Sequence, residues 1–213
     1  MKTLKTWVAA ATMLALSSAA YAAPVFLGRL ADGTASATCT VSGAAKCAMF
    51  YNTSLDVTIL NDWNIGRGFW SATAAAGSAQ ALAASAGAAQ TAFTGWLLPT
   101  GDRDSVAGAL NQYLSIWSDV GSSLVDLQAQ FDDVQAFFYW SGTEYAPVPV
   151  SAWLFSTTGG SQNLGVKSTA LYAVAVRPGD VTASVPEPQT LALGTAGVGR
   201  DGGGAQKAVT LRL

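Results

Sequence analysis

The fold of this chain is decided by three segments: Tyr139-Trp140-Ser141-Gly142-Thr143-Glu144-Tyr145, then Ala152-Trp153-Leu154-Phe155, then Leu171-Tyr172-Ala173-Val174-Ala175-Val176-Arg177-Pro178. Aromatic and β-branched residues dominate each segment, and such residues favour β-strands. The residues between the segments favour turns, namely Pro147, Pro149, Gly159, Gly160, Ser161, Asn163 and Gly165. The pattern therefore predicts an antiparallel β-meander over residues 135–177, which closes one α+β domain.

Upstream of the meander, the sequence predicts a strand and a first helix. Leu55, Val57 and Ile59 alternate with polar residues, as the residues of a half-buried strand do. Residues 73–92 are almost entirely Ala, Gln, Ser and Gly. That composition favours a helix that packs closely through small side chains, although a flexible linker would share it.

A second helix is expected to begin near Asp102 or Asp104, because either side chain can cap the first amides of a helix. Its apolar face would carry Val106, Leu110, Leu114 and Trp117. Two helices and a meander are therefore expected in a single domain over residues 23–183.

The residue motifs of the meander also resemble those of a known protein family. Tyr-Trp-Ser-Gly-Thr-Glu, Ala-Trp-x-Phe and Ala-Val-Arg-Pro follow in the order of the closing segment of the Lcl C-terminal domain family. The resemblance implies a bacterial extracytoplasmic protein with a C-type-lectin-like fold, which that family shares with the formylglycine-generating enzymes. Upstream, Gly95-Trp96-Leu97-Leu98-Pro99-Thr100 is similar to the family's Gly-Trp-Arg-Leu-Pro-Thr. Leu97 replaces the arginine, so a charged site at this corner is not inherited, while Trp96 and Leu98 are expected in the core.

Composition limits the functions that are open to the chain. It has 213 residues, a formal net charge of −2 and a sequence pI near 4.9, so it offers no basic surface for nucleic acid. It contains no histidine, which removes the commonest general base and the commonest zinc ligand. We expect no cofactor, no metal and no catalytic residue.

The beginning of the chain predicts export. Lys2 and Lys5 precede a largely apolar run over residues 7–16, and Ala20-Tyr21-Ala22 is a small-x-small cleavage site. Residues 1–22 are therefore interpreted as a signal peptide. The rival is a membrane anchor, but the run is short for a bilayer span.

Export decides how the two cysteines are interpreted. Cys39 and Cys47 flank a flexible stretch and would meet an oxidising compartment, so a short-loop disulfide is expected. The rival is a redox or catalytic thiol, for which the chain has no activating histidine.

Each of three groups of polar residues can be interpreted as a structural feature or as a functional site. Asn61, Asp62 and Asn64 could bind calcium, but a turn that caps the preceding strand is favoured. The acidic residues Asp126, Asp132 and Asp133 are interpreted as a solvated surface loop or short helix rather than as a calcium site. Glu144 and Arg177 could act as an acid and a clamp, but an ion pair at the strand ends is favoured.

The tail, residues 184–213, carries the motif Val185, Pro186, Glu187, Pro188. It resembles the PEP-CTERM sorting signal, which implies recognition by exosortase-type machinery. The apolar run that follows is about half of the roughly 20 residues that a membrane helix needs. We expect a truncated or frameshifted signal, a disordered tail and no stable membrane span in the mature chain.

These observations favour a non-catalytic extracytoplasmic protein, at the cell surface or in the extracellular matrix. Its expected partners are a glycan or exopolysaccharide, or a surface protein. One alternative is an enzyme of the formylglycine-generating branch, whose reactive cysteine pair lies in the C-terminal part of the domain, whereas both cysteines here lie far upstream. Another is an adhesin-like assembly subunit.

The signal peptide makes the first testable prediction. Cleavage after Ala22 should give exported protein that begins at Ala23, because the peptidase recognises the small residues at positions 20 and 22. Mass spectrometry of the exported chain measures this directly. Exported protein that still carries residues 1–22 would contradict the prediction.

Overall fold

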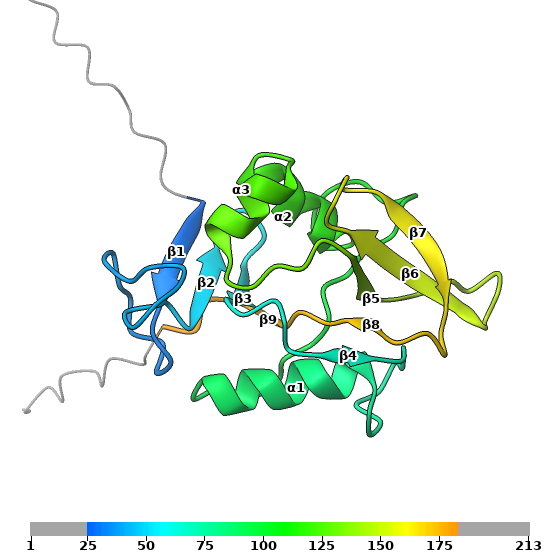
Figure 1. Ribbon diagram of the computed structural model, residues 1–213, viewed down its shortest axis with the longest axis horizontal. Coiled ribbons are helices and arrows are strands. Elements are labelled where there is room, and N and C mark those ends of the chain that lie inside the picture. Colours follow the sequence, from blue (N-terminus) through cyan, green and yellow to red (C-terminus); the bar gives the residue numbers. More distant parts are fainter. Residues whose placement is uncertain (1–24, 183–213) are drawn as a thin grey trace, which may run out of the picture. The chain divides into compact units, whose positions relative to one another are not determined.

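A computed structural model describes residues 25–182 of the chain (Figure 1). The expected signal peptide and the motif at residues 185–188 lie outside the described residues. Within them the fold is α+β, as the sequence predicts, with two sheets and three helices. No helix in this part of the chain has the length and apolar character needed to cross a membrane.

The smaller sheet joins the beginning and the end of the described chain. Its strands are β1 (Phe26–Arg29), β2 (Met49–Asn52), β3 (Val57–Leu60) and β9 (Val176–Pro178), all antiparallel, in the order β1-β2-β3-β9. Strand β3 is the strand expected at Leu55 to Ile59, but it starts at Val57 because Asp56 has a φ of 52° and turns the chain. All four residues of β3 are buried, so both of its faces lie in the protein rather than one.

The larger sheet contains the expected meander and extends it. Its strands are β4 (Arg67–Gly68), β5 (Phe138–Glu144), β6 (Ser151–Ser156), β7 (Gln162–Val166) and β8 (Leu171–Tyr172), in the order β4-β8-β5-β6-β7. Strands β5, β6 and β7 form an antiparallel meander. Strand β8 instead runs parallel to β5, and the two pair at Tyr139 and Tyr172.

Two details of the meander differ from the prediction. Asn163 and Gly165 were expected in a turn, but both lie in β7. Glycine suits this strand position because an added Cβ would lie 2.7 Å from the Trp140 ring. Residues 171–178 were expected to be one strand, but they divide between the two sheets, with the buried Ala173, Val174 and Ala175 between β8 and β9.

The helices cover opposite faces of the larger sheet, with α2 and α3 on one side of the strands and α1 on the other (Figure 1). Helix α1 (Ala79–Gln90) lies inside the range predicted for the first helix, and the Ser78 side chain caps it by accepting a hydrogen bond from the Ala81 amide. Its Gly87 is buried against Trp96, where an added Cβ would lie 2.2 Å from a ring carbon.

Helix α2 (Gln112–Val120) begins later than predicted, with Asn111 and not Asp102 or Asp104 as its cap. The Asp102 side chain instead accepts hydrogen bonds from the Asp104 amide and the Ser105 hydroxyl, which forms a turn. Val106 and Leu110 therefore lie exposed in a loop and not on the apolar face of the helix.

A third helix, α3 (Leu124–Gln130), follows α2 and is capped by Ser123. The predicted count of two helices was therefore wrong, although a short helix was one of the two interpretations of the stretch around Asp126.

Two hydrophobic clusters lie on the two faces of the meander. Tyr139 and Phe155 face the cluster beneath α2 and α3, which includes Trp63, Tyr113 and Phe131. The opposite face of the strands contributes Trp140 and Leu154 to the cluster that also holds the expected core residues Trp96 and Leu98. Burial raises the pKa of the Tyr113 and Tyr139 hydroxyls well above the ordinary value, so both remain neutral in the core.

The contact between Gly87 and Trp96 makes the second prediction. Gly87→Ala should destabilise the protein by about 1–3 kcal/mol through overpacking, although alanine forms helices better than glycine. Thermal unfolding measures the difference. The matched control is Gly159→Ala, where a Cβ meets no atom within 4 Å, and it should unfold like the parent. A Gly87→Ala protein that melts at or above the parent temperature would contradict this packing.

Candidate functional site

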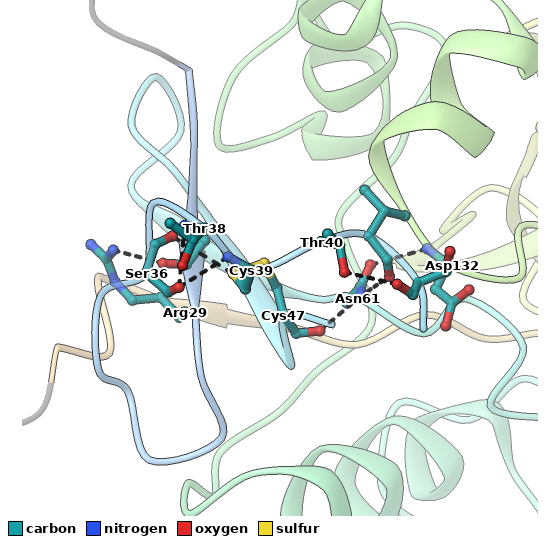
Figure 2. The surroundings of a disulfide bond; sticks show 11 residues. Arg29, Ser36, Thr38, Cys39, Thr40, Cys47, Asn61 and Asp132 are labelled. Carbon is teal, nitrogen blue, oxygen red and sulfur yellow. Dashed lines mark hydrogen bonds between the residues drawn. A yellow bond between two sulfur atoms is a disulfide. The ribbon is translucent and has the colours of Figure 1, made fainter. Parts of the chain in front are cut away.

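The two cysteines form the expected disulfide, with their Cα atoms 5.1 Å apart (Figure 2). The bond packs directly on β1. A Cβ added to Gly28 would lie 2.6 Å from Cys39 Sγ and 2.9 Å from Cys47 Sγ, so only glycine fits opposite the sulfurs. The disulfide therefore fixes its loop against the edge strand of the smaller sheet.

Asn61 holds the other side of the disulfide loop. Its buried side-chain amide donates to the carbonyl oxygens of Val41 and Cys47, at 2.6 and 2.8 Å (Figure 2). Lys46 in the same loop lies 3.0 Å from the Asp132 carboxylate, and this hydrogen bond raises the Lys46 pKa. Asn61 thus serves as a structural anchor.

The other residues weighed as calcium ligands also have partners within the protein. The Asp62 side chain accepts a hydrogen bond from the Asn64 backbone amide, which is the favoured turn, and the Asn64 side chain donates to Asp133. The Asp126 side chain accepts a hydrogen bond from the Ser123 hydroxyl at 2.5 Å. Over residues 25–182, no three His, Cys, Asp or Glu side chains come together in a group that could hold a metal ion.

A groove of about 670 Å³ runs beside the disulfide along β1. Phe26, Phe50 and the two cysteines contribute to its largely apolar lining. Arg29 also lines it, but its guanidinium makes hydrogen bonds of 2.9 and 2.6 Å to the Asp180 carboxylate. The groove therefore offers mainly apolar contact, and the one charged side chain among its lining residues is already paired.

A second hollow, which we call the hairpin corner, lies between the β5–β6 hairpin and the loop over residues 99–111. It has a volume of about 270 Å³ and is lined by Asp102, Asp104, Glu144, Tyr145, Ala146, Pro147 and Trp153. Carboxylates and aromatic rings thus share one small depression, which distinguishes it from the apolar groove.

Backbone contacts place the loop against the hairpin. The pairing of β5 with β6 is irregular between Trp140 and Glu144, and the loop docks at this irregularity. The Gly142 amide donates to the Pro99 carbonyl at 2.8 Å, and the Ser141 hydroxyl lies 3.0 Å from the carbonyls of both Gly101 and Trp153. The bulged strand therefore supplies the polar partners that a docked loop requires.

A buried pair of amide side chains fixes the rest of the loop. Asn111, the cap of α2, and Gln162, the first residue of β7, exchange hydrogen bonds of 3.0 and 2.6 Å. The Asn111 amide also lies 2.7 Å from the Asp102 carbonyl and 3.0 Å from the Ser105 carbonyl. One residue thus caps the helix and holds the turn that presents Asp102 and Asp104.

Trp153 forms the floor of the hairpin corner and is 3% exposed. The Tyr145 ring meets it edge to face at a centroid distance of 5.4 Å. The Arg103 guanidinium lies 5.5 Å from the ring centroid of Trp153. Trp153 is buried, as predicted for a core residue. It belongs to neither main cluster, and the side chains of Tyr145 and Arg103 pack against it.

The charged partner predicted for Glu144 was wrong. Glu144 pairs with Lys167, whose ammonium also lies 4.4 Å from the Trp70 ring centroid. Arg177 instead lies over the Phe93 ring at 5.2 Å. The reason is the division of residues 171–178, which carries Arg177 into the smaller sheet while Glu144 ends a strand of the larger one.

The lining of the hairpin corner offers a ligand two kinds of contact. It combines aromatic surface with carboxylate acceptors, and the residues that line it include no thiol or hydroxyl nucleophile paired with a base. Sequence reasoning singled out Glu144, Trp153 and the aspartates in other roles. It missed Arg103 and Tyr145, although Tyr145 directly precedes a proline-containing turn between two strands, where side chains are exposed.

Comparisons with known proteins give no further guidance. No protein-family model matches the chain, and no curated protein matches it.

The disulfide makes the third prediction. Replacing both cysteines by alanine should lower the free energy of unfolding by an amount near the low end of the 2–4 kcal/mol range, because the closed loop is short. Denaturant unfolding of the double variant and of reduced wild-type protein should agree. Thiol titration of unreduced, denatured wild-type protein should find no free thiol, and two titratable thiols would contradict the prediction.

Proposed function

We propose that the protein is an exported, non-catalytic module that binds saccharide at the hairpin corner. The single observation that carries this proposal is the depression in which Tyr145 and Trp153 lie beside three carboxylates. Its chemistry suits a sugar ring, which has an apolar face and a rim of hydroxyl groups.

Both halves of that chemistry are present. The partly buried Tyr145 ring offers apolar surface with a polar tip, which is a common feature of binding surfaces. Ionised carboxylates accept strong, charge-assisted hydrogen bonds from hydroxyl donors. Asp104 and Glu144 are both substantially exposed, so each can accept such bonds without a large cost of desolvation.

The cellular setting of the proposal comes from the sequence. The resemblance to the Lcl C-terminal domain supports a C-type-lectin-like fold, and the α+β architecture with its meander is compatible with that fold. The pattern of residues 1–22, the disulfide and the Val185 to Pro188 motif all favour a protein at the cell surface or in the extracellular matrix, sorted by exosortase-type machinery. We favour a module over an enzyme because both cysteines are paired and the chain has no histidine.

The proposal makes the fourth prediction, for the oxidised full chain on an array of neutral, amino and acidic saccharides. Wild-type protein should bind at least one class. Tyr145→Ala should weaken that binding by about tenfold or more, because it removes the ring from the hairpin corner; one factor of ten is about 1.4 kcal/mol.

The matched control is Tyr51→Ala, which removes a tyrosine from β2 in the smaller sheet and should leave binding unchanged. Equal binding by the Tyr145→Ala and wild-type proteins, or no binding to any saccharide, would contradict the proposed site.

A further inference from the structure

We propose that Arg103 is a displaceable cover over Trp153, and that the ligand of the hairpin corner is a neutral saccharide whose ring takes the place of the guanidinium. This inference rests on the proposed function and names the class of saccharide and the residue that controls access to the site.

The Arg103 side chain lies between the Trp153 ring and the solvent. Its guanidinium lies 5.5 Å from the centroid of the Trp153 ring, and its side chain is 65% exposed. The indole therefore has protein beneath it and a solvent-facing arginine above it. Moving Arg103 would open one side of Trp153 while leaving Tyr145 in place at the edge of the ring.

Arg103 is held only weakly. Its ion pair joins two neighbouring residues, Arg103 Nε and Asp104 Oδ1, at 3.4 Å, and both side chains are about two-thirds exposed. Exposed ion pairs of this kind contribute little to stability because water competes for both charges. Arg29, by contrast, is buried and makes two hydrogen bonds to Asp180.

Arg67 gives the closest comparison within the described residues. It also stacks on aromatic rings, at 5.0 Å from Phe137 and 5.2 Å from Tyr172. Unlike Arg103, it donates two hydrogen bonds to the Ala170 carbonyl, at 3.1 and 2.8 Å. Arg67 is therefore fixed over its rings by the backbone, whereas Arg103 is free to leave.

The charges at the rim select against an acidic ligand. Asp102, Asp104 and Glu144 line the hollow, and Lys167 is already paired with Glu144. Once Arg103 moves aside, the carboxylates outnumber the cations, and like charges at a recognition surface repel a wrong partner. Hydroxyl groups of a neutral sugar can instead donate to the free oxygens of Asp104 and Glu144.

The test measures binding of two probes to the oxidised full chain by isothermal titration calorimetry: a neutral β-linked glucan hexasaccharide and an oligogalacturonate of the same length. Wild-type protein should bind the glucan at least tenfold more tightly than the galacturonate. Arg103→Ala should bind the glucan about threefold or more tightly than wild type, because the ligand no longer displaces a side chain. Arg67→Ala is the control and should leave the affinity unchanged.

The outcomes separate this inference from the proposed function. Tighter galacturonate binding, or weaker glucan binding by Arg103→Ala, would overturn the cover and the neutral ligand while the saccharide site stands. A gain in Arg103→Ala that Arg67→Ala matches would also overturn the cover, because the effect would not be local. Failure of all three proteins to bind either probe, or any saccharide on the array, would overturn both proposals.

Discussion

Residues 171–178 tie the two sheets together, and the rest of the structure depends on this crossing. The segment pairs with β5 and β4 through β8, and with β3 through β9. Between the two strands, the Ala173 amide donates to the Gly66 carbonyl and the Ala175 carbonyl accepts from the Leu60 amide, at 3.2 and 2.9 Å. Ala173, Val174 and Ala175 are all fully buried, so the crossing lies inside the protein.

The packing of the larger sheet determines which surfaces are left for binding. The larger sheet lies between α1 on one face and α2 with α3 on the other (Figure 1). Most of the aromatic residues of β5 and β6 are therefore buried in the core. The β5–β6 hairpin end is instead covered by the loop over residues 99–111, which brings carboxylates and an arginine to Trp153. The candidate site therefore arises where a loop replaces a helix as the cover of the sheet.

Much of the fold follows from local pattern, and its failures have physical causes. The aromatic strands β5 and β6, the buried Trp96 and the disulfide were all predicted because composition and compartment determine them locally. Strand β7 was missed because its glycine serves a contact with Trp140 that no local pattern reveals. The ion-pair partner of Glu144 and the cover over Trp153 depend on where the chain crosses between sheets and how a loop folds back, so sequence spacing could not give them.

Saccharide binding at the hairpin corner is tested most directly by a nuclear magnetic resonance titration of the isotopically labelled, oxidised full chain with the neutral hexasaccharide. We expect the largest shift changes on the backbone amides of residues 102–104 and 144–146 and on the Trp153 indole, which line or cover the hairpin corner. Amides around Cys39 and Cys47 should remain unchanged. Changes centred on the groove beside the disulfide, or no changes at the hairpin corner at saturating saccharide, would contradict saccharide binding at the hairpin corner.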